Sequence, residues 1–223
     1  MKRFLAVLFA WCMIGAANAQ VTYTATVGNY TSIADFTSCP SGETCTNYTT
    51  AMKQSGSFTV PTALAPNMAG DIAASVVSYS FNDGINTYSK ANADDRTNFF
   101  SVTTDASGNI TGVAIMVSKW LSGTNGSHVV GDQFSYMFLG SASFNNLNCT
   151  GVALTFAGSA DACVNENGGV GASFAQSPVA VVWSSAVTSN TPASIPTLSE
   201  WGLIIMSALL ALGTLVVMRR RQI

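Results

Sequence analysis

The sequence FFSVTTDASGNITGVAIMV, residues 99–117, predicts a β-hairpin and with it the fold class of the chain. Its two arms, 99–104 and 110–117, are rich in β-branched and aromatic residues, which fit the pleated surface of a sheet. The residues between them, Asp105 to Asn109, are of types that accept tight turns and positive φ angles. Two antiparallel strands joined by a short loop are therefore expected here.

The same kind of sequence recurs on both sides of the hairpin. Residues 21–27, VTYTATV, alternate β-branched and aromatic residues with small polar ones and stop at Gly28. The expected strands are 21–27, 57–60, 75–81, 98–104, 110–119, 133–139, 152–156 and 179–184. Eight such segments separated by turn residues predict a mainly β domain over residues 20–185, arranged as an antiparallel sandwich or a related fold. A helical turn is expected only within 63–74, where Pro66 can open one.

Charge is scarce along the chain. Charged residues make up 9% of the sequence, far below the ~25% usual for soluble globular proteins, whereas hydrophobic residues make up 48%. Residues 20–194 hold four Lys and Arg against ten Asp and Glu, a balance of −6. Because a nucleic-acid-binding surface needs clustered positive charge, the composition excludes nucleic acid as a partner. Ser and Thr, about a quarter of this segment, supply uncharged polar groups for solvent-facing strand positions.

Residues 1–19 have the layout of a secretory signal peptide. A basic start precedes an apolar run over 4–16, and Ala17 and Ala19 are the small residues that signal peptidase requires, so cleavage is expected after Ala19. A lipoprotein signal built on Cys12 fits less well, because a bulky tryptophan precedes that cysteine. An uncleaved anchor is the other alternative, but the run is shorter than the ~20 residues that span a bilayer.

Residues 201–218 form an uncharged apolar stretch that ends directly at Arg219, Arg220 and Arg221. At 1.5 Å per residue such a helix is about 27 Å long, and the arginine stems can extend its reach toward the ~30 Å of a hydrocarbon core. One transmembrane helix is expected here, with Trp201 at the outer interface. Because basic flanks stay cytoplasmic, the preceding chain would face the periplasm in a precursor anchored in the inner membrane.

The segment before this span carries a short motif. Residues 186–194 are small and polar and predict a flexible stalk, and residues 195–202 read IPTLSEWG. The motif positions are Ile195, Pro196, Thr197, Leu198, Trp201 and Gly202. Pro196 favours extended backbone at its own position and at the residue before it, which would present the chain just above the membrane. From the residues alone, a proline-containing linker before an ordinary tail anchor is equally suitable.

The order of motif, apolar span and arginine cluster over residues 195–223 resembles the IPTL-CTERM sorting signal, a relative of the PEP-CTERM signals of Gram-negative bacteria. The resemblance implies that an exosortase, a multi-pass membrane enzyme with a cysteine nucleophile, recognises this tail and cuts near Pro196. The protein would then be displayed on the cell surface or released. It would be a substrate of that enzyme and a client of signal peptidase and the export machinery.

Four cysteines remain after the expected removal of the signal peptide: Cys39, Cys45, Cys149 and Cys163. An even number in an oxidising compartment favours disulfides over metal or redox chemistry. Of the three connectivities, the pairing Cys39–Cys45 with Cys149–Cys163 closes the shortest loops and is the prediction. Neither gap fits the spacing of a zinc site.

Residues with chemistry of their own are few. His128 is the only histidine, no G-x-S-x-G motif accompanies it, and its Gly- and Asn-rich surroundings predict a solvated loop residue rather than a catalytic base. We therefore expect no enzyme and no cofactor, with a secreted hydrolase resting on His128 as the remaining alternative. Asp83, Asp94 and Asp95 are the candidate calcium ligands, against the simpler interpretation as turn and cap residues.

These observations predict an exported, non-enzymatic envelope protein with a structural, adhesive or extracellular-matrix role, and an extracellular polysaccharide as a candidate partner. The alternative is a surface module that binds carbohydrate or another ligand, with or without calcium. The strand aromatics are expected to be mostly core, and a few could line such a site because aromatic rings stack on the apolar faces of sugars. They are Tyr79, Phe81, Tyr88, Phe99, Phe100, Trp120, Tyr136 and Trp183.

Overall fold

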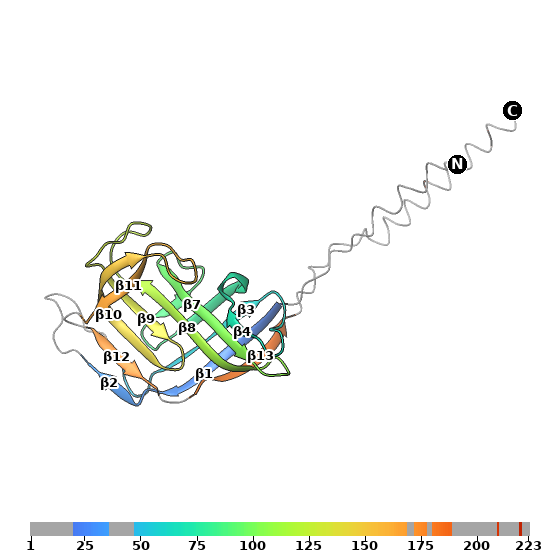
Figure 1. Ribbon diagram of the computed structural model, residues 1–223, viewed down its shortest axis with the longest axis horizontal. Coiled ribbons are helices and arrows are strands. Elements are labelled where there is room, and N and C mark those ends of the chain that lie inside the picture. Colours follow the sequence, from blue (N-terminus) through green and yellow to red (C-terminus); the bar gives the residue numbers. More distant parts are fainter. Residues whose placement is uncertain are drawn as a thin grey trace. The chain divides into compact units, whose positions relative to one another are not determined.

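The computed structural model describes residues 20–35, 47–168, 172–177 and 180–188, together with Leu209 and Arg219. Within these residues the chain forms thirteen strands and one short 3₁₀ helix. All strand pairs are antiparallel and fall into two sheets (Figure 1). The prediction of a mainly β, antiparallel domain is confirmed.

The first sheet has five strands in the order β13-β1-β3-β5-β6. Its members are β1 (Gln20–Asn29), β3 (Lys53–Val60), β5 (Ser78–Asn82), β6 (Thr87–Ser89) and β13 (Val182–Thr188). The alternation in β1 sets the inner face of this sheet, because Val21, Tyr23, Ala25 and Val27 are buried while the threonines between them point the other way.

The second sheet has eight strands, in the order β2-β12-β10-β9-β8-β7-β4 with β11 also paired to β10. Their bounds are β2 (Ser32–Ala34), β4 (Ala69–Asp71), β7 (Asp95–Thr104), β8 (Ile110–Trp120), β9 (Gln133–Phe138), β10 (Ala142–Ala153), β11 (Ala162–Asn167) and β12 (Ser173–Gln176). The hairpin predicted from residues 99–117 is the β7–β8 pair, with Val102 opposite Val113.

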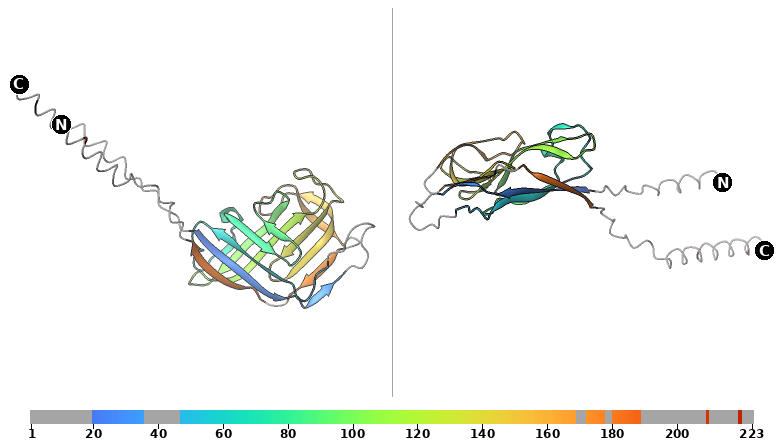
Figure 2. Two further views of the ribbon diagram at one scale, coloured as in Figure 1. Left: turned by 180° about the vertical axis from the view of Figure 1, so that it is seen from behind. Right: turned by 90° about the horizontal axis from the view of Figure 1, so that it is seen from below.

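The two sheets pack face to face around one main core (Figure 2). Rings from both sheets meet there: Phe58 of β3 lies 5.1 Å from Phe100 of β7 and 5.2 Å from Tyr23 of β1, measured between ring centroids. The core also takes Ile115 and Val117 from β8 and aliphatic residues from β1. Side chains from the facing surfaces of the two sheets thus share one core.

Several elements differ from the prediction. Of the strand expected at 152–156, only Val152 and Ala153 are strand residues, at the end of the long β10, and residues 154–156 lie in the connection after it. Strand β5 begins three residues later than expected, after the 3₁₀ helix Ala73–Ser75. The helical turn therefore lies at the end of the 63–74 segment and not at Pro66. Strand β13 continues to Thr188, because the first residues of the expected stalk pair with the start of β1.

Most of the two terminal segments lies outside the described residues. This holds for the predicted signal peptide with Ala17 and Ala19, for the Cys39–Cys45 pair, for residues 189–194 and for the sorting-signal positions except Arg219. Leu209 and Arg219 are helical. Among the described residues, no helix has the length and apolar composition needed to cross a membrane.

Candidate functional site

The outer face of the eight-stranded sheet carries a second apolar cluster, separate from the main core. Its buried members are Trp120, Phe134, Tyr136, Leu147, Cys149, Cys163 and Ala172. Aromatic rings continue from it across the sheet, with Tyr136 and Phe144 stacked 4.5 Å apart and Phe144 lying 4.7 Å from Phe174. This end of the sheet is covered on both faces, by the apolar cluster on one side and by buried polar groups such as Ser135 and Asn145 on the other, so β9 shows four consecutive buried residues where a half-exposed strand would alternate.

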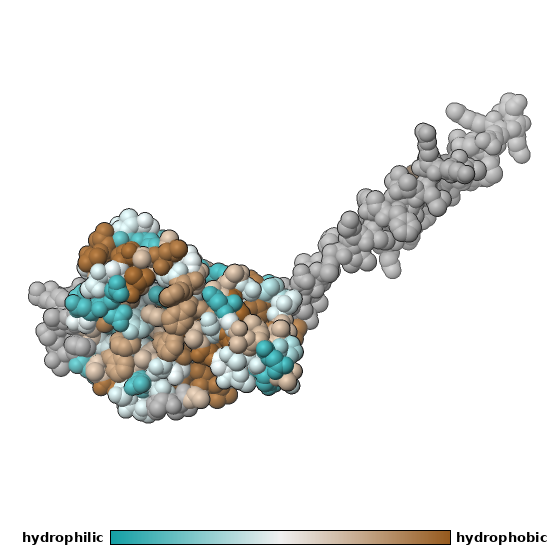
Figure 3. Space-filling view, viewed as in Figure 1, coloured by the Kyte–Doolittle hydropathy of each residue, from teal (hydrophilic) through white to brown (hydrophobic). Residues whose placement is uncertain are grey.

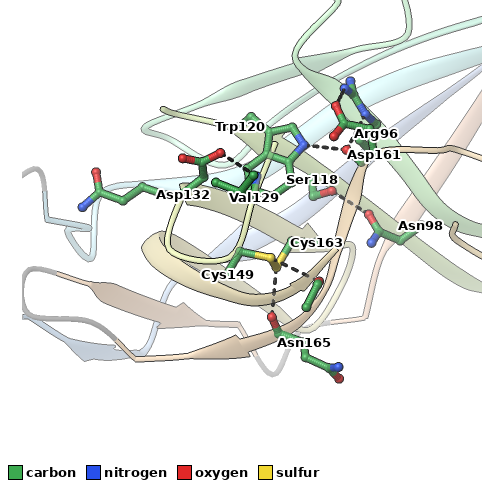
Figure 4. Close-up of a disulfide and its surroundings, with 12 residues drawn as sticks. Arg96, Asn98, Ser118, Trp120, Val129, Asp132, Cys149, Asp161, Cys163 and Asn165 are labelled. Atoms are coloured by element: carbon green, nitrogen blue, oxygen red, sulfur yellow. Dashed lines mark hydrogen bonds and ion pairs between the residues drawn. A yellow bond between two sulfur atoms is a disulfide. The ribbon is translucent and has the colours of Figure 1, made fainter. Parts of the chain in front are cut away.

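A disulfide fixes β11 to β10 at the border of this cluster. Cys149 and Cys163 are bonded with their Cα atoms 5.7 Å apart, which confirms the predicted pairing (Figure 4). The bridge closes the turn that joins the two strands, where the register of the pair also shifts near Gly151. The chain from Ala153 to Asp161 is thereby held against the outer face of the sheet.

Asp161 ties this turn to the loop between β8 and β9. Its carboxylate accepts hydrogen bonds from His128 Nδ1 at 2.7 Å and from the His128 backbone N–H at 2.8 Å. It also accepts from the Gly126 N–H at 2.8 Å and forms an ion pair with Arg96 at 2.9 Å. The Trp120 indole donates to the Asp161 carbonyl and stacks on the His128 ring at 4.2 Å. We call these residues the Asp161 latch.

The position of His128 corrects the expectation of a solvated loop residue. Its side chain is 1% exposed, since the indole of Trp120 covers one face of the ring and Asp161 binds Nδ1. Burial raises the pKa of Asp161, but the hydrogen bonds from His128, Arg96 and Gly126 outweigh it and lower the pKa to about 2. The carboxylate is therefore charged at neutral pH and holds both loops.

The latch pairs a histidine with a carboxylate, as two members of a catalytic triad do, and it also joins two loops. No serine oxygen among the described residues is hydrogen-bonded to the His128 ring. The hollow beside the ring measures about 80 Å³ and is lined by Asp94, Ser122 and His128 among others, and Ser122 Oγ is occupied by the Gln133 N–H. A hollow of this size has room for ordered water rather than for a substrate.

A larger cleft opens between the latched turn and strands β7 and β8. Its volume is about 370 Å³, within the range of small-molecule sites. It is lined by Asn98, Phe99, Met116, Ala153, Leu154, Thr155, Phe156, Cys163, Val164 and Glu166. Phe99 and Met116 stand opposite each other on β7 and β8, and the disulfide-linked β11 contributes Val164 and Glu166.

The rim of the cleft is unusually apolar for an exposed surface. Phe156 is 95% exposed and Leu154 66%, although both are large hydrophobic side chains. Val129 and Val130 of the neighbouring loop are also exposed, and Figure 3 shows apolar side chains gathered over this end of the domain. Exposed apolar groups that cluster around a concave site are typical of a binding surface rather than of chance exposure.

Two side chains that line the cleft, Asn98 and Glu166, each have a polar atom that can make a further hydrogen bond. Ser118 Oγ donates to Asn98 Oδ1 at 2.8 Å, and within the described part of the chain the Asn98 amide nitrogen makes no hydrogen bond (Figure 4). The Tyr136 hydroxyl donates to Glu166 Oε1 at 2.9 Å. Burial, followed by the hydrogen bond and the charge of Glu166, raises the pKa of Tyr136, so the phenol remains a donor. The other carboxylate oxygen of Glu166 is left for a ligand.

Two of the three calcium candidates, Asp83 and Asp95, have carboxylates that other groups of the protein contact. Asp83 is fully buried and its carboxylate already accepts four hydrogen bonds, from the hydroxyls of Tyr48 and Tyr88 and from two backbone N–H groups. Asp95 accepts from the Ser89 N–H and lies 3.6 Å from the Lys119 ammonium. No group of three or more His, Cys, Asp and Glu side chains in the described ranges could hold a metal ion. The structure gives the calcium hypothesis no support.

Comparison with known proteins identifies the tail. Residues 193–222 match the model of the IPTL-CTERM motif. The predicted sorting signal is thereby confirmed as a sequence motif, and it implies an exported, surface-directed protein. No curated protein and no solved structure matches the chain. The β domain therefore has to be interpreted from its own geometry.

Proposed function

We propose that this protein is an exported precursor that its C-terminal helix anchors in the inner membrane, with the β domain in the periplasm, until an exosortase removes the tail. The observation that carries the proposal is the IPTL-CTERM match at residues 193–222. Its support in the sequence is the order of motif, apolar stretch and Arg219–Arg221, which matches the order of recognition site, membrane span and cytoplasmic stop.

The processed product would be a β domain that works outside the cytoplasm, in a structural or adhesive role. Two features support this. The Cys149–Cys163 disulfide is a bond that persists in oxidising compartments. The sandwich also needs few charges for solubility, because threonine and serine hydroxyls occupy outward strand positions such as Thr24 and Ser57.

A second candidate function is binding of a ligand by the exported domain. The cleft of about 370 Å³ on the outer face of the eight-stranded sheet favours it. A polysaccharide is one candidate ligand, since aromatic rings lie along that face. Calcium assistance is not proposed for it.

The tail proposal is tested by the C-terminus of the protein recovered from membranes, cell surface and medium. We expect intact-mass spectrometry to find a product that ends near Pro196 in the surface or medium fraction. Replacing Pro196→Ala together with Trp201→Ala should leave the full-length precursor in the membrane fraction. Asn190→Ala, outside the matched residues, serves as the matched control and should be processed normally.

Two results would oppose the proposal. Continued cleavage of the double variant at an unchanged site would show that the motif does not direct processing. An intact tail on the surface-exposed protein would show that the signal acts only as an anchor.

A further inference from the structure

We propose that the cleft on the outer face of β7 and β8 binds a small organic cation with an apolar body. The inference names the ligand class for the second candidate function and rests on it, but it does not depend on processing of the tail. Its starting point is a concave site of about 370 Å³ whose walls are held by a disulfide and by the Asp161 latch. A site with fixed walls requires little ordering when a ligand enters.

The side chains that line the cleft favour a ligand with an apolar body. Phe99 and Met116 form the strand side of the cleft, and Leu154, Phe156 and Val164 line the opposite part. In the part of the lining that the structure describes, the polar side chains are Asn98, Thr155 and Glu166. Thr155 Oγ1 is used internally, because it donates to the Thr97 carbonyl at 2.7 Å and accepts from the Ser159 N–H at 3.0 Å.

This scarcity of polar partners argues against a sugar as the occupant. A sugar ring carries several hydroxyl groups, and each one buried without a partner opposes binding. Among the described side chains that line the cleft, the groups with a free bonding position are the Asn98 amide nitrogen and one oxygen of Glu166. A ligand with a single polar group and a hydrocarbon or ring body fits these partners better.

The charge of the cleft determines which charge the polar end of the ligand can carry. Among the described residues that line the cleft, Glu166 is the one that carries a charge. Arg96, two residues before Asn98 on β7, is bound by the Ala160 and Asp161 carbonyls, by Asn125 and by the Asp161 carboxylate. A cationic head beside Glu166 is therefore favoured and an anionic head is repelled, by a modest factor because Glu166 is exposed.

The test uses the protein recovered from the periplasm or medium with its disulfide intact. The neutral dye N-phenyl-1-naphthylamine reports occupancy of an apolar site by its fluorescence. Dodecyltrimethylammonium and dodecyl sulfate, both below their micelle concentrations, then compete for the dye with the same chain and opposite charge. We expect the cation to displace the dye at a concentration about two- to fivefold lower than the anion.

Three variants make the test specific. Phe156→Ser should weaken dye binding about tenfold without disturbing the fold, because that side chain is 95% exposed. Glu166→Gln should keep dye binding and abolish the preference for the cation. Val77→Ser removes an exposed apolar side chain that does not line the cleft and should change neither result.

The inference is overturned by any of three results: dye binding that Phe156→Ser leaves unchanged, a preference for the anion, or displacement by maltose but not by the ammonium compound. A shift to dimer in size-exclusion chromatography that Phe156→Ser abolishes, without dye binding, would instead assign the patch to a second copy of the chain. Each readout uses the recovered protein and none depends on where its tail ends, so a failed tail-processing experiment leaves this test intact.

Discussion

Three buried or half-buried aspartates show how hydrogen-bond partners decide what a carboxylate does. Asp83 and Asp161 each accept four hydrogen bonds, and both connect separate parts of the chain. Asp95 differs, because its Oδ2 accepts from the Ser89 N–H while its Oδ1 is buried without a hydrogen-bond partner. Burial consequently dominates there and raises the pKa of Asp95 to about 6, despite the Ser89 N–H and the Lys119 ammonium.

This raised pKa predicts an unusual dependence of stability on pH. Between about pH 4 and pH 6 the folded state holds the Asp95 proton more tightly than the unfolded state, so the free energy of unfolding falls as the pH rises through that window. The fall due to this residue should be about 1–3 kcal/mol. Urea unfolding of Asp95→Asn at pH 4, 5, 6 and 7 should lack this component of the slope.

Asp35→Asn, at an exposed position, is the matched control. Its free energy of unfolding should keep the wild-type dependence on pH. Asp161 acts in the opposite direction, because its pKa of about 2 gives stability that is present above pH 4 and is lost as the pH falls toward 2. Parallel pH profiles for wild type and Asp95→Asn would contradict the assignment.

Whether a strand can be predicted from its sequence depends on what stabilises it. In β1 and in the β7–β8 hairpin, alternation and turn residues agree with the tertiary packing, so local sequence is sufficient. Strand β10 begins as ASFNNLNCTG, with asparagines in place of β-branched residues and a left-handed Asn146, and it is a strand because β9 and β12 pair with it on both sides. A short segment of sequence read by itself does not reveal such pairing.

The candidate site shows the same limit. The Cys149–Cys163 bridge follows from spacing and compartment, so the sequence predicts it. The latch joins His128 to Asp161, which are 33 residues apart, and the cleft combines residues of β7, β8 and β11. Leu154 and Phe156 belong to the segment 152–156, which the sequence predicts as a strand, and their exposure beside the cleft is visible only in the structure.

Strand β3 offers a test of close packing within one element. Gly56 lies opposite Ala25 on one side and Phe81 on the other, with a φ of +149°. A Cβ atom there would lie 2.3 Å from the Ser80 carbonyl oxygen and 2.6 Å from Phe81 Cα, both backbone atoms. We expect Gly56→Ala to lower the free energy of unfolding by about 2–4 kcal/mol in chemical denaturation.

Gly112→Ala in β8 is the control for that experiment. It is also a strand glycine, but its added Cβ would meet nothing nearer than Thr103 Cβ at 3.7 Å, an ordinary contact. Its stability should stay within about 0.5 kcal/mol of wild type. Equal effects of the two substitutions would mean that glycine entropy, and not the approach of β3 to β5, determines the cost.

For the protein as a whole, the compartment that the sorting signal implies has to agree with the chemistry of the β domain. The sorting signal implies export, and the domain contains a disulfide that stays oxidised only outside a reducing cytosol. Cys163 also lines the cleft, so the same bond that marks the compartment supports the candidate binding site. A chain retained in the cytosol should therefore lose stability and ligand binding together.

This coupling gives the last prediction. Peptide mapping after alkylation should find Cys149 and Cys163 protected in the exported protein, and labelled when residues 1–19 are deleted and the chain stays inside the cell. The reduced form should be less stable by about 3 kcal/mol, the chain-entropy value for a loop of this size, and should bind the dye more weakly because β11 is no longer held. The double variant Cys149→Ser, Cys163→Ser, exported normally, lacks the disulfide but reaches the same compartment. It therefore separates the effect of the bond from the effect of export. If that double variant kept full stability and dye affinity, the disulfide would be a mark of location only.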